Sequence, residues 1–180
     1  MLAITLPAAR LFDERTEEFV SLPAVTLKLE HSLISISKWE SKWHKSFLSA
    51  KEFTVEEFRD YVRCMSIGQE PGAEILARIN PKHIADIWAY IQDPMTATTI
   101  THRGKQRMVA NQRITAETVY YWMVSFGIPF ECEKWHLNRL LMLIEVCAIK
   151  QNPQKMNKRE AAAMRAAANE ANRKRFGSKG

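Results

Sequence analysis

Residues 115–149 read TAETVYYWMVSFGIPFECEKWHLNRLLMLIEVCAI, and this stretch decides the fold. Thr115 is suited to cap a helix, because its hydroxyl can accept a hydrogen bond from an unpaired amide of the first turn. Apolar residues then recur at steps of three and four, which predicts one helical face: Val119, Trp122, Met123 and Phe126.

The same stretch contains a corner and a second helix. Gly127 can adopt the left-handed conformation that ends a helix, and Pro129 cannot continue one. Helical spacing resumes with a second apolar set: Trp135, Leu140, Leu141, Ile144 and Cys147. The sequence therefore predicts a helical hairpin that belongs to the core and is not an active site.

The positive charge of the chain lies in its last residues. The 180-residue chain has 26 basic and 20 acidic residues, a net charge of +6. From Lys150 onward there are nine basic and two acidic residues, which leaves 17 and 18 in the preceding part. Because the body is near neutral, a basic nucleic-acid-binding face on it is not expected.

The N-terminal residues predict short strands. Residues 24–29 partly alternate and follow Pro23, so they predict a strand. A strand near residues 3–6 could pair with it, and the acidic run 13–18 between them is interpreted as an exposed turn. No run approaches about 20 apolar residues, and no basic leader precedes an apolar segment, so we expect no membrane span and a cytoplasmic protein.

A tryptophan stripe follows. Five apolar residues are spaced as one face of a helix: Leu33, Ile36, Trp39, Trp43 and Phe47. The two indoles, with Lys38 and Lys42 beside them, could stack on nucleic-acid bases. We favour a core stripe edged by lysine stems, because a helical tryptophan stripe normally packs inside a protein.

Two further helix starts are marked. Thr54 and Glu57 form a capping-box pattern, and Asn80-Pro81 supplies an N-cap and a first-turn proline. A short turn of helix is expected at residues 73–79. Helical spacing disappears at residues 95–114, which predict a β-hairpin or an extended loop.

Basic residues supply the candidate contact sites for a partner. The 95–114 segment carries Arg103, Lys105 and Arg107, and an equally valid interpretation is a solvated hairpin without a partner. The alanine-rich stretch after Asn157 has strong helix propensity but little apolar face, so it should fray or fold on a partner. Its candidate contact residues are Arg159, Arg165, Arg173, Lys174 and Arg175.

No catalytic pattern stands out. Cys132 and His136 are four residues apart, but two ligands do not make a zinc site, and a nucleophile pair would lack an orienting residue. Three free buried cysteines are expected, at positions 64, 132 and 147. The chain has no glycine-rich phosphate loop, so we expect no metal, no cofactor and no enzyme activity.

Several phrases together resemble a known family. These are SISKWESKWHKSFLS (35–49), YIQDPMTATT (90–99), YYWMVSFGIPFECEKWHLNRLLMLIEVCAIK (120–150) and ANEANRKRFGSKG (168–180). They resemble proteins encoded among the tail genes of long-tailed bacteriophages, namely tail-assembly chaperones or related tail morphogenesis proteins. The likeness covers about residue 29 to the end, and it supplies no binding residues.

The resemblance implies an assembly factor of the host cytoplasm that is absent from the finished virion. Such a chaperone binds the long, helical tape-measure protein until the tail tube polymerises around it. A structural virion component, such as a head–tail connector or tail-completion protein, and a nucleic-acid-binding module remain as alternatives, and homo-oligomerisation stays open. The expected fold is mainly α: a helical domain over 1–150 with a small β-hairpin and N-terminal strands, and a basic tail over 151–180.

Overall fold

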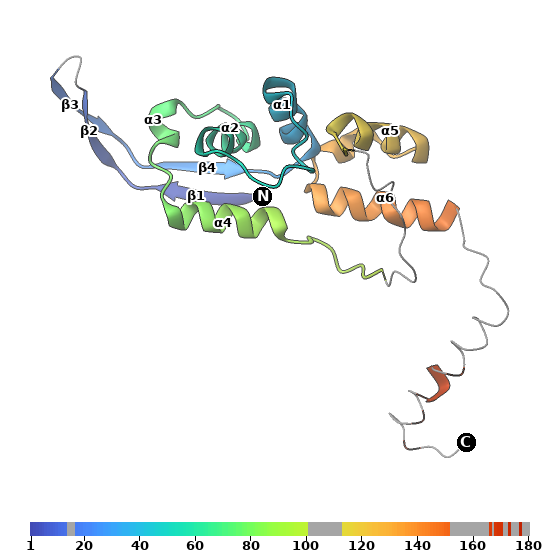
Figure 1. Ribbon diagram of the computed structural model, residues 1–180. Coiled ribbons are helices and arrows are strands. Elements are labelled where there is room, and N and C mark those ends of the chain that lie inside the picture. The colour runs from blue at the N-terminus through green and yellow to red at the C-terminus, as the bar shows by residue number, and fades with distance from the viewer. Residues whose placement is uncertain are drawn as a thin grey trace. The chain divides into compact units, whose positions relative to one another are not determined.

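The computed structural model describes residues 1–13, 17–100 and 113–151, with residues 166, 168–170, 173 and 177. The described part is mainly α-helical with two small antiparallel sheets, which confirms the expected fold class (Figure 1). The chain divides into two compact units, Met1–Glu145 and Val146–Gly180.

Four strands within the described residues form two separate ribbons. β1 (Leu2–Leu6) pairs with β4 (Val25–Leu29), as the sequence predicts. β2 (Ala9–Asp13) and β3 (Glu18–Leu22) form a second antiparallel ribbon with Phe12 opposite Phe19. The interpretation of residues 13–18 as a simple turn was therefore wrong at both ends, because each end lies in a strand.

Helices α1 (Leu33–Trp43) and α2 (Val55–Met65) pack together. Ser32 caps α1, and the predicted capping box of Thr54 and Glu57 starts α2. α1 ends earlier than the apolar spacing predicted, because His44 adopts the left-handed conformation. Phe47 lies beyond that end but is still buried beside Trp39.

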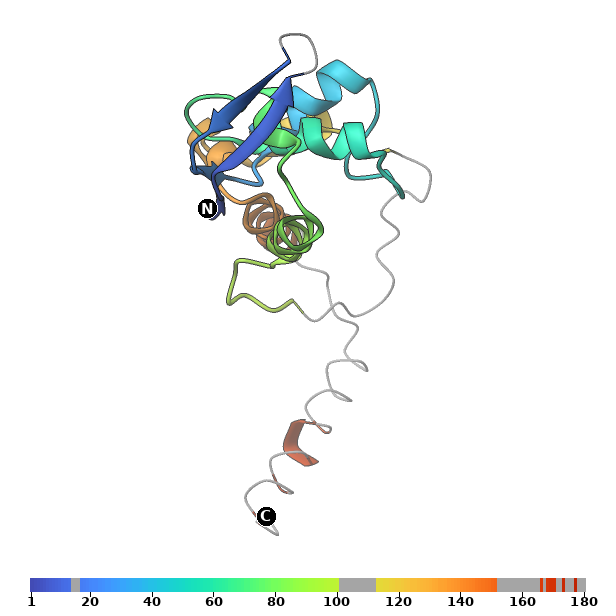
Figure 2. The same cartoon turned by 90° about the vertical axis from the view of Figure 1, so that its left-hand side faces the viewer.

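The next helices are α3 (Ala73–Leu76) and α4 (Pro81–Gln92). Asn80 caps α4 and Pro81 occupies its first position, as predicted. α4 lies along the β1–β4 ribbon (Figures 1 and 2). Residues 95–100 and 113–114 contain no strand, which agrees with the extended loop that we expected as the alternative to a hairpin; the rest of the 95–114 segment lies outside the described residues.

The stretch that opened the sequence forms α5 (Ala116–Phe126), a 3₁₀ helix η1 (Phe130–Lys134) and α6 (Leu137–Gln151). Gly127 ends α5 at φ 64°, which confirms the predicted corner. The assignment of Trp135 to the second helix was wrong, because Trp135 ends η1 in an extended conformation and α6 begins two residues later.

A buried carboxylate fixes where α5 begins. Glu40 of α1 is 7% exposed and accepts hydrogen bonds from the amides of Phe47 and Ala116, each at 2.7 Å. Burial raises the pKa of Glu40, and the two amide hydrogen bonds partly oppose that rise. One side chain thus joins α1, the loop after it and the first residue of α5.

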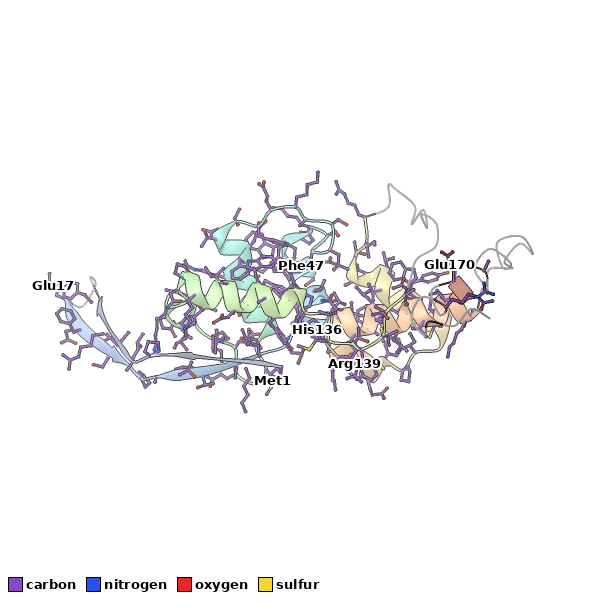
Figure 3. All side chains as sticks on the ribbon, turned by 90° about the horizontal axis from the view of Figure 1, so that it is seen from below. Met1, Glu17, Phe47, His136, Arg139 and Glu170 are labelled. Carbon is purple, nitrogen blue, oxygen red and sulfur yellow. The ribbon has the colours of Figure 1, made fainter. Side chains whose placement is uncertain are left out.

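Aromatic rings fill the centre of the first unit. The ring of Phe47 lies 4.0 Å from that of Tyr61 and 4.9 Å from that of Phe53, measured between centroids. Trp39 contacts both Phe47 and Phe53 edge-on. Figure 3 shows Phe47 within the body and Glu17 at the end of the β2–β3 ribbon.

Candidate protein-interaction surfaces

Most of the predicted basic contact residues lie outside the described residues: Arg103, Lys105, Arg107, Arg159, Arg165, Lys174 and Arg175. Arg173 is described, and it is helical and exposed. The structure therefore brings no two of these predicted residues together within its described part.

The tryptophan stripe is a core feature, as we favoured. Trp39 is fully buried, and its indole nitrogen donates to the backbone oxygen of Glu57 at 2.9 Å. Trp43 stacks on Trp39 and donates to Asp60 at 2.8 Å, while Lys42 pairs with the same carboxylate at 2.7 Å. Trp39 therefore exposes no face to an incoming base, and Lys42 is already paired with Asp60.

The carboxylate of Asp60 is held ionised by these contacts. Burial acts to raise its pKa, but hydrogen bonds from Lys42, Arg63 and Trp43 outweigh burial and hold the pKa below its usual value. Lys45 pairs in the same way with Glu57. Acidic groups on the buried side of α2 are thus already matched by cations of this chain.

Two histidines meet inside the first unit. The rings of His31 and His136 are 5.1 Å apart between centroids, and both residues are buried. His31 Nδ1 shares a hydrogen bond with the hydroxyl of Tyr61, and His136 Nε2 lies 3.0 Å from the backbone oxygen of Tyr90. A backbone bond from Leu137 to the oxygen of His31 closes the junction at 2.7 Å.

The histidine pair is structural in character. Burial, reinforced by the neighbouring His136, lowers the pKa of His31 to about 3, and burial also lowers the pKa of His136. Both imidazoles are therefore neutral at pH 7 with hydrogen-bond partners in place. No group of three or more His, Cys, Asp or Glu side chains within the described ranges could hold a metal ion.

The expectation of three buried free cysteines is confirmed for two of them. Cys64 and Cys132 are buried free thiols, as expected, whereas Cys147 is half-buried, so the prediction of burial was wrong for it. Burial raises the pKa of Cys64, which keeps the thiol protonated.

The β2–β3 ribbon, called the arm below, exposes large apolar side chains. Phe12, Phe19 and Val20 are 52%, 71% and 44% exposed. The rings of Phe12 and Phe19 contact one another across the strands at 5.2 Å between centroids. The arm leads away from the helices, and Glu17 marks its end (Figures 1 and 3). A two-stranded ribbon is marginal alone, so such an arm gains stability when a partner covers it.

A clamp fixes the base of the arm. Arg78, between α3 and α4, donates from Nη2 to the backbone oxygens of Leu6 at 3.3 Å and Pro23 at 3.1 Å. The same nitrogen bonds the oxygen of Pro7. These carbonyls flank both strands of the arm, so its root is held although its end is exposed.

α5 and η1 expose a second apolar surface. Tyr121, Val124 and Phe130 are each more than half exposed. Tyr120 lies beside Phe130 and donates to Glu133 at 2.8 Å, which orients the neighbouring ring. Burial and this hydrogen bond to Glu133 raise the pKa of Tyr120.

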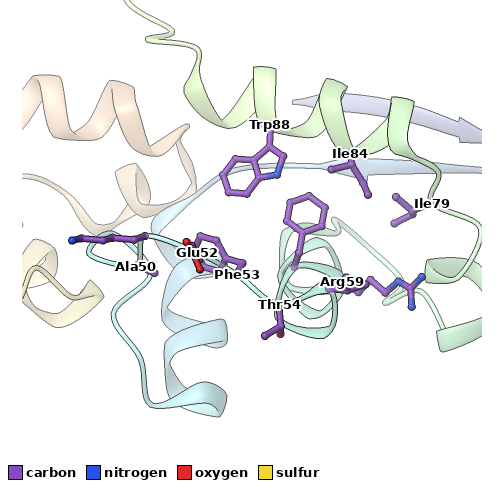
Figure 4. Close-up of a pocket in the computed structure, with 11 residues that line it drawn as sticks. Ala50, Glu52, Phe53, Thr54, Arg59, Ile79, Ile84 and Trp88 are labelled. Carbon is purple, nitrogen blue, oxygen red and sulfur yellow. The ribbon is translucent and has the colours of Figure 1, made fainter.

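A third feature is an open pocket of about 420 Å³ between α2, α4 and the loop of residues 50–54, called the aromatic pocket below (Figure 4). Trp88 of α4 lies between two phenylalanines, with ring centroids 5.3 Å from Phe58 and 5.8 Å from Phe53. Ile79 and Ile84 continue the apolar wall. Its floor is anchored, because Phe53 also contacts Trp39 and Phe47 of the core.

Sequence reasoning missed the arm and the aromatic pocket. Phe53 and Phe58 flank the capping box of α2 at the positions of a hydrophobic staple, which is a readable signal. The spacing could not reveal that Trp88, 30 residues after Phe58, contacts both rings. For the arm, the signal was the pair of phenylalanines on either side of the acidic run.

Comparison with known proteins adds no relative: no family model, no curated protein and no solved structure matches the chain. Among the described helices, none combines the length and the apolar character that crossing a bilayer requires. The function is therefore inferred from the residues and their geometry.

Proposed function

We propose that this protein is a bacteriophage tail-assembly chaperone that binds the tape-measure protein during tail morphogenesis in the host cytoplasm. The resemblance of residues 29–180 to tail-assembly proteins supports this function. The observation that carries it is the arm, whose Phe12 and Phe19 are exposed side by side. A chaperone for a long apolar helical protein needs such an exposed apolar surface for a partner to cover.

The proposal is tested by co-expression with the tape-measure gene of the same phage. The soluble fraction of the tape-measure protein should rise, and the two proteins should co-purify. Replacing Phe19 by Ser should weaken both effects, since interface aromatics carry much of the binding energy. The matched control is Ile67→Ser, which removes another apolar side chain that is half-exposed but lies outside the arm.

Two outcomes contradict the proposal. Unchanged solubility together with no co-purification rules out the chaperone role. Detection of this protein by mass spectrometry in purified particles would also contradict the proposal, because a chaperone is missing from virions, whereas a connector or tail-completion protein is present in them. Circular dichroism of each variant confirms that the arm substitution leaves the helical body folded.

A further inference from the structure

The aromatic pocket is pre-formed. Phe58 is buried, and the backbone at Phe53 is fixed by the capping box that starts one residue later. Trp88 is stacked on Phe58 with an angle of 23° between the ring planes. These rings cannot close over the opening without losing contacts that anchor them to the core. A volume of about 420 Å³ falls within the range of small binding sites.

Two cations that line this pocket, Arg59 and Lys51, have no partner among the described residues, and they outnumber its acidic lining residue, Glu52. Arg59 lines the pocket, and Figure 4 shows it at the end where Ile79 lies. The neighbouring cations of the same region are satisfied, because Lys42 and Arg63 bind Asp60 and Lys45 binds Glu57. Arg59 makes no hydrogen bond or ion pair with any described residue, so its guanidinium is available to an incoming carboxylate.

The walls also limit the shape of an occupant. They are two helices and a loop, and no described strand borders the opening. An extended peptide would find no strand edge to pair with, whereas a helix can insert side chains from one face at spacings of three and four residues. The basic tail of this chain is a poor occupant, because its cations would meet Arg59 and Lys51 at the rim.

We propose that the aromatic pocket is an anchor site for an amphipathic, acidic helical segment of a partner protein. The segment inserts an aromatic or long aliphatic side chain against Trp88 and Phe58. A carboxylate one turn away pairs with Arg59. This site is separate from the arm, and the proposal for it does not depend on the chaperone role.

The test uses the full chain and fluorescently labelled helical peptides that differ in two positions. The reference peptide carries a Phe anchor with Glu four residues later; one variant replaces Phe by Ala, and another replaces Glu by Lys. Fluorescence anisotropy should show binding of the reference peptide, with affinity falling roughly thirtyfold without the anchor. Replacing Glu by Lys should weaken binding by about fivefold or more.

Charge reversal in the protein makes the test specific. Arg59→Glu should weaken binding of the reference peptide and restore binding of the Lys peptide. A general loss of structure could not produce this exchange of preference. The matched control is Lys82→Glu, the same charge change on exposed α4 residue Lys82, which does not line the pocket. Trp88→Ala should abolish anchoring. Val55→Ser, at a rim residue that is 65% exposed, should weaken anchoring without disturbing the core.

Three results overturn the proposal. The first is that no peptide binds at millimolar concentration. The second is peptide binding that responds equally to Arg59→Glu and Lys82→Glu, since the pocket would then not be the site. The third is preferential binding of a single-stranded oligonucleotide that needs Arg59 and falls steeply with salt, which would assign the pocket to nucleic acid instead.

Discussion

Replacing Glu40 tests how one buried carboxylate fixes the junction of α1 and α5. Its two oxygens accept separate backbone hydrogen bonds, Oε1 from Phe47 and Oε2 from Ala116. Glu40→Gln keeps the shape of the side chain but leaves only one oxygen to accept. The amide nitrogen of the new side chain then faces a backbone N–H that has lost its acceptor.

The expected loss of stability follows from the number of backbone amides that lose their acceptor. An orphaned buried amide costs roughly 1–3 kcal/mol, so Glu40→Gln should lower the free energy of unfolding by about 2 kcal/mol. Glu40→Ala orphans both amides and leaves a cavity, so its cost should reach about 4 kcal/mol. Glu117→Gln is the control, because it makes the same chemical change at an exposed position in the first turn of α5.

Urea denaturation followed by circular dichroism measures these differences at pH 7.5. Hydrogen exchange adds a local reading, since one of the amides of Phe47 and Ala116 should lose protection in Glu40→Gln. First-turn charge is worth at most about 1 kcal/mol, so Glu117→Gln should stay near wild type. A loss below about 0.5 kcal/mol for Glu40→Gln would refute the reasoning, as would equal losses for both Gln variants.

Three further predictions concern pH, the arm and the corner. The pKa of His31 falls to about 3 on folding, so the unfolded chain binds more protons below pH 6.5 and stability decreases as pH falls. Between pH 7.5 and pH 5 the loss from His31 should be about 2 kcal/mol in urea titrations, and His31→Gln should reduce it; an unchanged pH dependence in His31→Gln would contradict the burial of a neutral imidazole at this position. Arg78→Ala should cost about 2–3 kcal/mol and speed limited proteolysis within residues 7–24. Arg78→Lys should be milder, because Nη2 alone donates to the backbone oxygens of Leu6, Pro7 and Pro23, and equal damage by both variants would contradict the clamp. Gly127→Ala should cost about 1 kcal/mol by thermal denaturation, because φ is 64° while an added Cβ meets no atom within 4 Å; a neutral result would contradict backbone strain as the cause.

Local signals in the sequence determined much of the fold. α2 starts at its N-cap Thr54, α4 starts at its N-cap Asn80, and α5 ends at Gly127. Each of these signals acts through backbone groups within four residues, so it can be recognised in the sequence. Apolar spacing found the buried face of α1 but extended the helix past His44, whose left-handed backbone is not visible in spacing. The preference for a core stripe was likewise confirmed for Trp39, which is fully buried.

What the sequence could not predict depends on residues far apart in the chain. Glu40 lies beside Trp39 in the predicted helix, and no neighbouring residue indicates that the amide of Ala116, 76 positions later, donates to it. His31 and His136 come together only through packing of the segments around them. The arm and the aromatic pocket are of the same kind, since each is defined by cross-strand or interhelical contacts that a one-dimensional pattern does not contain.

The arm and the aromatic pocket share one short connection. Arg78 binds the carbonyls at the base of the arm, and the next residue, Ile79, forms part of the pocket wall. A single peptide unit thus links the two surfaces, and the N-cap of α4 at Asn80 fixes it from the other side. A partner that contacts both surfaces would bind the second one at a high effective concentration once the first is engaged. Combining Phe19→Ser with Arg59→Glu should therefore reduce affinity for such a partner more than either change alone, whereas a partner of the arm alone should not respond to Arg59→Glu.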